Sequence, residues 1–242
     1  MRLHVTGATG YLGSELVRLR PDATGERIEV RDAGAVSEGF RRLRPDVVIH
    51  TAYRQDEHDV NTVGSENVAR ATAAIGARLV HVSTDVVFDG RKGSPYVEDD
   101  RLSPVTEYGR SKAEAELRVV LAHPEALLVR TSLLYGGAEP SKHERAARDP
   151  AMSFFTNEIR SPVQVGDLAA ALLELAELDR SGPLHVAGAD AVSRAELAEL
   201  IRGGPVRTQP APESRPLDCS LDSSRAQALL RTRLRGVHEV LG

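Results

Sequence analysis

The hydrophobic residues of this chain fall into short continuous runs that alternate with longer amphipathic segments. Such runs occupy residues 46–50, 78–83 and 126–130. A short apolar run between helical patterns is typical of a strand that is buried on both faces of a parallel sheet. Apolar positions at helical spacing separate the runs, as in residues 38–43 and 62–75. The pattern therefore predicts an α/β fold in which a doubly wound parallel sheet is covered by helices on both faces.

The first loop of the chain is rich in glycine. A strand-like run at residues 2–5 is followed by Gly7, Gly10 and Gly13 and then by a helical pattern. In this context the glycines allow a tight turn and a close approach of the backbone to a pyrophosphate at the helix N-terminus. The first two glycines are one residue further apart than in the common G-x-G-x-x-G pattern, and a glycine-rich turn without a ligand is the alternative.

A second candidate motif places Lys112 four residues after Tyr108. The chain has only three lysines, the others being Lys92 and Lys142, so arginine supplies most of the cations. In a helix this spacing puts both side chains on one face, one turn apart. An ammonium beside a phenol lowers the phenol pKa towards the range of a general acid. The alternative interpretation is an ordinary exposed helix.

Composition narrows the class of protein. With 242 residues, 41% of them hydrophobic, the chain can bury a sizeable core, and its net charge of −4 argues against nucleic-acid and membrane surfaces as partners. Cys219 is the only cysteine, which favours a reducing, cytoplasmic location, and no run is long enough for a membrane span. The eight histidines lack metal-ligand spacing, so we expect no metal site, and we interpret His81 as a satisfied core histidine.

Several motifs together resemble the extended short-chain dehydrogenase/reductases, and within them the dTDP-4-dehydrorhamnose reductase group. In chain order they are Thr6-Gly7-x-x-Gly10-x-x-Gly13, residues 44–49, 83–90 and 95–98, Pro104, Tyr108-Gly109-x-Ser111-Lys112, residues 130–132, 161–163 and 167–169, Arg215-Pro216 and Leu221-Asp222. Each motif alone is weak, but the combination is specific and covers most of the chain. The resemblance implies a Rossmann-type sheet with a small carboxy-terminal substrate lobe.

The resemblance also implies catalytic roles for four residues. Tyr108 would protonate the substrate carbonyl oxygen, and Thr84 would hydrogen-bond the same oxygen from the carboxyl end of a strand. Lys112 would hold the nicotinamide ribose and depress the Tyr108 pKa. Asn61 matches a position that supports a proton relay behind the lysine; its alternative role is to cap a helix that begins at Thr62.

We expect NADPH as the cofactor, with NADH as the alternative. Arg31 aligns with the carboxyl end of the family's second strand, where a guanidinium would pair with a 2′-phosphate. A register shift of one residue would instead present Asp32 to the ribose 2′-hydroxyl. The resemblance implies cofactor contacts at Thr6, Gly7, Thr9, Gly10, Tyr11, Leu12, Gly13, Arg31, Asp32, Ala52, Tyr108 and Lys112.

The second half of the chain departs from the family more than the first. Residues 1–150 are expected to form the NAD(P)-binding domain, and residues 151–242 a smaller, partly interleaved lobe that adds a late strand at residues 183–186. This lobe is shorter than is typical of the family, and Leu133 stands where many members have a large aromatic residue. Candidate substrate contacts are Asp85, Val86, Leu133, Arg160 and Arg215, although Arg215 fits a structural role equally well.

The expected activity is reduction of a keto group, on a nucleotide-activated 4-keto sugar as the small-molecule substrate. Dehydration is disfavoured because Val86 replaces the second carboxylate that related dehydratases carry after their threonine. An epimerase, a reductase of a non-sugar carbonyl, and a non-catalytic NADP-binding regulatory subunit, like the beta subunit of methionine adenosyltransferase, remain alternatives. A homodimer is compatible with the resemblance.

Overall fold

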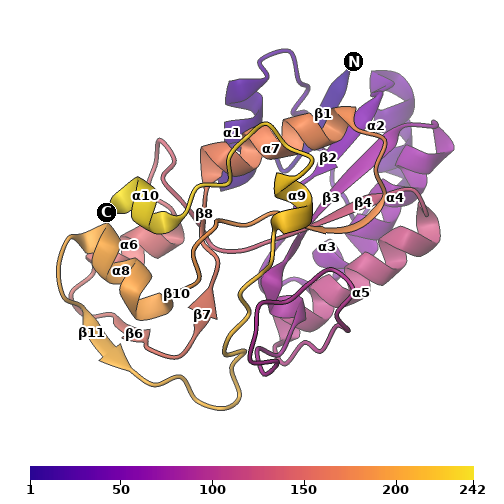
Figure 1. Ribbon diagram of the computed structural model, residues 1–242. Coiled ribbons are helices and arrows are strands. Elements are labelled where there is room, and N and C mark those ends of the chain that lie inside the picture. Colours follow the sequence, from indigo (N-terminus) through magenta and orange to yellow (C-terminus); the bar gives the residue numbers. More distant parts are fainter.

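The centre of the molecule is a five-stranded parallel sheet, in a computed structural model that describes residues 1–242 (Figure 1). In spatial order its strands are β1 (Leu3–Thr6), β2 (Val47–His50), β3 (Arg78–Thr84), β4 (Leu127–Thr131) and β9 (Gly182–His185). The three predicted buried strands and the predicted late strand are thus confirmed.

Helices cover both faces of this sheet. On one face, α1 (Tyr11–Leu19) and α7 (Val165–Glu177) contribute to a core cluster of 22 buried residues. On the other, α2 (Ala33–Leu43), α4 (Val63–Ala74) and α5 (Glu107–Ala122) contribute to a cluster of 12. Every residue of β1, β2 and β4 is buried because neither face of the sheet meets solvent. The doubly wound α/β fold predicted from the hydrophobic pattern is confirmed.

The second strand that the alignment of Arg31 assumed is not formed. After α1 the chain makes a single parallel bridge, from Thr24 to His4, and residues 25–29 belong to no strand. Residues 30–31 lie in a turn that leads into α2. The edge beyond β1 therefore carries only this bridge.

The smaller elements form a lobe beside the carboxyl edge of the sheet. Three two-stranded pairs belong to it: β5 (Leu134–Tyr135) with β8 (Val163–Gln164), β7 (Ile159–Arg160) with β10 (Val192–Ser193), and β6 (Ser153–Phe155) with β11 (Arg207–Gln209). Its helices are α6 (Lys142–Arg148), α8 (Arg194–Arg202) and α10 (Val237–Leu241). The remaining elements are three short helices: α3 (His58–Asn61), η1 (Asp85–Val87) and α9 (Ser224–Gln227).

The chain passes repeatedly between the sheet and this lobe (Figure 1). After β5 to β8 it returns through α7, which packs on α1, and through β9, which pairs with β4. After β10 to β11 it returns again, and Leu221 bridges to Tyr96 beside the sheet. Only then does it end in α10, against α8.

No helix combines the length and the apolar character that a membrane span requires.

Candidate active site

The carboxyl end of β3 carries the first candidate catalytic group. Thr84 ends the strand and caps η1, and its hydroxyl accepts the Val86 backbone N–H at 3.4 Å. The same hydroxyl donates to the Asp85 carboxylate at 3.0 Å. Thr84 is half-buried, at the edge where open parallel sheets bind their ligands.

The start of α5 is fixed against η1. The Thr106 hydroxyl caps this helix by accepting the Gly109 backbone N–H at 3.0 Å. A Cβ on Gly109 would lie only 2.3 Å from the Val86 carbonyl oxygen. The glycine after Tyr108 therefore lets the first turn of α5 approach η1, and this approach brings Tyr108 beside Thr84.

The Tyr108 phenol is held in its protonated form. Burial is the largest cause that raises the pKa of Tyr108; neighbouring Tyr53 and Asp85 raise it further, and a hydrogen bond to Thr84 opposes them. The Tyr53 ring lies 5.9 Å from the Tyr108 ring, measured between centroids. A phenol whose pKa is raised keeps its proton at neutral pH, but it is a weaker general acid than one whose pKa lies near the working pH.

Lys112 lies one helical turn after Tyr108, but its ammonium faces the sheet. It is only 3% exposed, and its Nζ donates to the Val82 carbonyl at 2.8 Å and lies 3.4 Å from His81 Nε2. Burial lowers the pKa of Lys112 to about 8, and the Glu116 carboxylate opposes the shift. The expectation that Lys112 depresses the Tyr108 pKa is wrong for this arrangement, because the ammonium is directed at Val82 and His81.

His81 is buried as expected, but it is not a satisfied core histidine. Its Nε2 faces Lys112, and its Nδ1 has no hydrogen-bond partner. Its ring lies 5.2 Å from that of His50, whose two nitrogens bond to the Thr6 and Ser65 hydroxyls at 2.6 and 3.0 Å. Burial is the largest cause that lowers the pKa of both histidines, so both rings are neutral beside the Lys112 ammonium.

Sequence reasoning missed Glu116, one turn beyond Lys112. Its buried carboxylate pairs with Arg130 at 2.9 Å and accepts from the Ser83 hydroxyl at 2.5 Å. The signal was present in the sequence, because Tyr108, Lys112 and Glu116 recur every four residues. The pair holds α5 against β3 and β4 behind the candidate site.

Asn61 is the last residue of α3, and it does not cap the following helix. Its buried carboxamide accepts the Arg54 N–H at 3.0 Å and donates to the Arg54 carbonyl at 2.7 Å and to the Ser111 hydroxyl at 3.0 Å. The helix-cap alternative is therefore wrong. No hydrogen bond joins Asn61 to Lys112; the side chain ties the loop after β2 to α5.

The glycine loop joins β1 to α1, as predicted. Gly7 has a φ of +70°, and a Cβ on it would lie 2.8 Å from the Ala52 backbone. A Cβ on Gly13 would lie 2.1 Å from the Gly7 carbonyl oxygen, so only glycine lets α1 pack this closely. Gly10 is the N-cap residue of α1 and offers no side-chain cap, and Thr9 and Gly10 are exposed, which leaves the first amides of the helix open to an anion.

The other side chains of the predicted cofactor set have partners within the protein. The Thr6 hydroxyl bonds to His50, and Leu12 is buried in the core. The Tyr11 hydroxyl accepts the Gly137 N–H at 2.8 Å and donates to Glu144 at 3.2 Å, so it faces the lobe. The contacts left to Thr6, Tyr11 and Leu12 are those of their backbone.

Arg31 and Asp32 lie in the turn before α2. The exposed Arg31 guanidinium pairs with Glu29 at 2.8 Å and with Glu57 at 3.2 Å. The Asp32 carboxylate caps α2 by accepting the Ala35 N–H at 3.0 Å. The Asp32 carboxylate is thus engaged in capping α2. The Arg31 ion pairs are exposed, so a ligand can replace them at little cost in free energy.

The structure does not favour two of the predicted substrate contacts. Arg160 is 1% exposed, and it donates to three backbone carbonyls and pairs with Glu158 at 2.9 Å and Asp85 at 3.6 Å. Asp85 is equally buried and accepts from the Ser132 hydroxyl at 2.6 Å; burial raises its pKa, and Arg160 is the largest opposing cause. Both side chains are saturated by the protein.

The remaining predicted substrate contacts differ in how exposed they are to solvent. Arg215 is half exposed but pairs with Glu158 at 2.8 Å and covers the Phe155 ring, its guanidinium 4.9 Å from the centroid. Its alternative, structural role therefore describes the observed contacts better. Val86 and Leu133 are half-buried, and Leu133 packs at the edge of a small lobe cluster.

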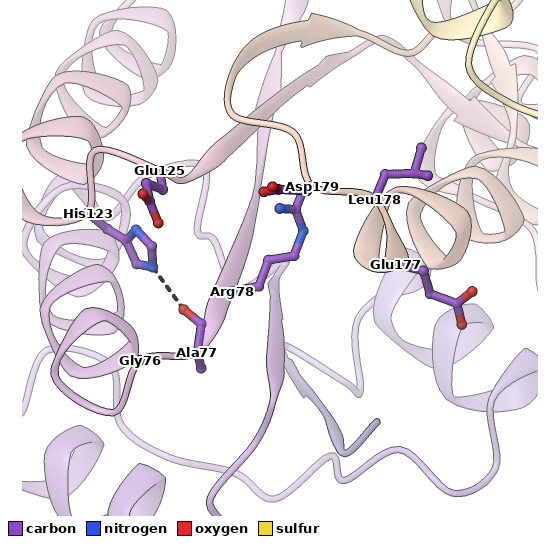
Figure 2. A pocket seen from close by; sticks show the side chains of 8 residues that line it. All are labelled: Gly76, Ala77, Arg78, His123, Glu125, Glu177, Leu178 and Asp179. Atoms are coloured by element: carbon purple, nitrogen blue, oxygen red, sulfur yellow. Dashed lines mark hydrogen bonds between the residues drawn. The ribbon is translucent and has the colours of Figure 1, made fainter.

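A shallow surface pocket lies away from all of these residues. Figure 2 shows it, with a volume of about 280 Å³. Its lining comes from the chain before β3, the connection from α5 to β4, and the end of α7. It therefore lies at the amino ends of the parallel strands, opposite the edge that carries Thr84. No group of three or more His, Cys, Asp or Glu side chains is arranged to hold a metal ion.

Comparison with known proteins gives consistent results. The RmlD substrate binding domain family matches residues 1–241. A dTDP-4-dehydrorhamnose reductase of Mycolicibacterium smegmatis is 36% identical, over 80% of this chain and 66% of its own length, slightly under two thirds.

Two solved structures extend the similarity to nearly full length. A hypothetical dTDP-4-dehydrorhamnose reductase from Sulfolobus tokodaii has a TM-score of 0.86 and 31% identity, and covers 97% of each chain. The dTDP-4-dehydrorhamnose reductase of Bacillus anthracis, in complex with NADP, has a TM-score of 0.87 and 26% identity, and covers 99% of this chain and 96% of that one.

Proposed function

We propose a function from one premise: the chain belongs to the RmlD substrate binding domain family. We infer that it is an NAD(P)H-dependent oxidoreductase that reduces the 4-keto group of a nucleotide-activated sugar, with chemistry of the short-chain dehydrogenase/reductase type. The observation that carries this inference is the close packing of α5 on η1 at Gly109, which brings Tyr108 to Thr84 at the carboxyl edge of the sheet, one turn from Lys112.

The cofactor site supports this function. Bound NADPH supplies a hydride to the carbonyl carbon. The uncapped start of α1 and the Gly7 turn against Ala52 would receive the diphosphate, and Arg31 would receive the 2′-phosphate. The NADP complex of the related Bacillus anthracis structure accords with this assignment.

The chain's own groups would then handle the proton. Thr84 would turn its hydroxyl proton from Asp85 to the carbonyl oxygen and so position it, and Tyr108 would transfer its phenolic proton to that oxygen as negative charge develops there. The Lys112 ammonium, which donates to the Val82 carbonyl in this structure, would turn from that contact to hold the ribose side of the cofactor. The raised Tyr108 pKa leaves little tyrosinate at neutral pH for the proton abstraction that an epimerase requires.

The proposal also assigns one ligand to each part of the chain. We assign the cofactor to residues 1–150 and the sugar nucleotide to the lobe built mainly from residues 151–242. A homodimer and a cytoplasmic location remain predictions from the sequence.

The test is NADPH oxidation in the presence of a 4-keto nucleotide sugar. We expect turnover with this substrate and little with small non-sugar carbonyls. Tyr108→Phe should lower kcat by roughly 10² to 10⁴, the usual contribution of a positioned general acid, and leave NADPH affinity nearly unchanged. NADPH binding without turnover on any carbonyl would instead support a regulatory subunit.

A further inference from the structure

Two cations of the lobe lack the ion-pair partners that their neighbours have. Arg194 is the first residue of α8, and Lys142 is the first residue of α6, which packs against α8. The Arg194 guanidinium makes no side-chain hydrogen bond and no ion pair, although the residue is only half exposed. The Lys142 ammonium donates to the uncharged Gln55 side chain at 3.0 Å and likewise forms no ion pair.

The carboxylates near Arg194 are already occupied. Its backbone N–H donates to the Glu158 carbonyl at 2.9 Å, which places Arg194 beside that residue. The Glu158 carboxylate, however, pairs with Arg160 at 2.9 Å and with Arg215 at 2.8 Å. Asp85 is bound by Ser132 and Thr84 and lies 3.6 Å from Arg160. Neither carboxylate is free to neutralise Arg194.

The electrostatic surroundings agree with this geometry. Burial lowers the pKa of Arg194, with Glu158 opposing and the nearby Arg160 and Arg215 charges adding to the shift. Burial and then the Arg194 charge lower the pKa of Lys142, which the exposed Asp56 opposes without forming an ion pair. The same two cations contribute to lowering the pKa of His143 to about 3, after burial, so its ring is neutral. A chain with a net charge of −4 thus leaves a half-buried Arg194 and an exposed Lys142 close together without counter-charges.

The position of this pair borders the candidate active site. Asp85, whose charge acts on Arg194, directly follows Thr84. Gln55, which Lys142 contacts, lies in the loop after β2, two residues beyond Tyr53, whose ring neighbours Tyr108. Arg194 and Lys142 therefore lie between the lobe and the carboxyl edge of the sheet.

We propose that Arg194 and Lys142 form an anion subsite that takes the diphosphate of the sugar nucleotide. A diphosphate carries two or more negative charges, and a guanidinium binds phosphate oxygens in a bidentate manner. The ligand would supply the neutralisation that the protein does not, and the neutral His143 would add a hydrogen-bond donor. This assignment replaces Arg160 and Arg215, which the protein already pairs, and it rests on the proposed function for the identity of the ligand.

The test compares thymidine diphosphate with thymidine as ligands of the full chain in the presence of NADP⁺, by isothermal titration calorimetry. Arg194→Gln should raise the Kd of thymidine diphosphate ten- to a hundredfold, the loss of one charged hydrogen-bonding interaction, and leave NADP⁺ binding unchanged. Lys142→Gln should raise it less, and added salt should reduce the effect of both. Arg202→Gln, an exposed arginine at the other end of α8, is the matched control and should behave as wild type.

Other outcomes separate this inference from the proposed function. An Arg194→Gln protein that binds thymidine diphosphate as tightly as wild type overturns the subsite, as does a wild-type protein that binds thymidine equally well. If Arg194→Gln loses NADP⁺ binding through misfolding, the same comparison in Lys142→Gln decides. Arg194-dependent binding without keto-sugar reduction would keep the subsite and refute the reductase; reduction with an unchanged KM in Arg194→Gln would do the reverse.

Discussion

Replacing Gly109 by alanine should displace Tyr108 and leave the cofactor site unchanged. The new methyl group would meet the Val86 carbonyl oxygen at 2.3 Å, whereas ordinary contacts begin near 3.4 Å. Because Val86 belongs to η1 and its backbone is held by Thr84, the first turn of α5 has to retreat by about 1 Å. A displacement of about 1 Å at a reacting group costs about 10²-fold in rate.

The assay is kcat for NADPH oxidation with the 4-keto nucleotide sugar, together with thermal unfolding and NADPH affinity. We expect kcat to fall about 10²-fold, with a loss of about 1–3 kcal/mol in stability from overpacking and an unchanged cofactor Kd. Gly204→Ala is the control, because a Cβ there meets nothing within 4 Å. If Gly109→Ala retains full kcat and full stability, the close approach of α5 to η1 does not position Tyr108, and the reasoning fails.

Three further perturbations follow from the site. Burial lowers the pKa of Lys112 from 10.5 to about 8, so kcat/KM should fall as pH rises through about 8. The stability of the fold should rise between pH 8 and 10.5, because the unfolded chain binds more protons than the folded chain in that range. A kcat/KM that stays constant up to pH 10 would contradict this role of Lys112. Arg31→Ala should raise the Kd of NADPH about ten- to a hundredfold and leave that of NADH unchanged, and equal effects on both cofactors would remove Arg31 from 2′-phosphate recognition. Glu116→Gln leaves Arg130 buried without its counter-charge and should cost about 3–5 kcal/mol in urea unfolding, against at most about 1 for the surface variant Glu114→Gln; similar losses in the two variants would refute the buried pair.

The fold was predictable from the sequence because its signals are local. The apolar runs of β2, β3 and β4 are continuous since both sheet faces are covered, and the glycines around α1 are required by contacts as short as 2.1 Å. Local signals failed at residues 28–32, where the sequence is compatible with a strand. The chain instead makes a single bridge to β1 at Thr24, and that depends on the whole path between α1 and α2.

The site was predictable only in part, for a different reason. Motif spacing placed Tyr108 and Lys112 on one helix face, but it could not show that Val82 and His81, on another strand, engage the ammonium. Nor could it show which arginines find carboxylates. Arg160 and Arg215 both pair with Glu158, whereas Arg194 does not, and these contacts join segments that are distant in the sequence.

The repeated passage of the chain between sheet and lobe limits how specificity can be altered. Because α7 and β9 lie between the two main stretches of the lobe, no single cut releases the lobe and no single graft replaces it. Exchanging this lobe with that of a relative requires at least two coordinated segment replacements, one from β5 to β8 and one after β9. Under the proposed function, a new sugar preference is therefore reached more readily by substitutions within the existing lobe than by replacement of the whole lobe.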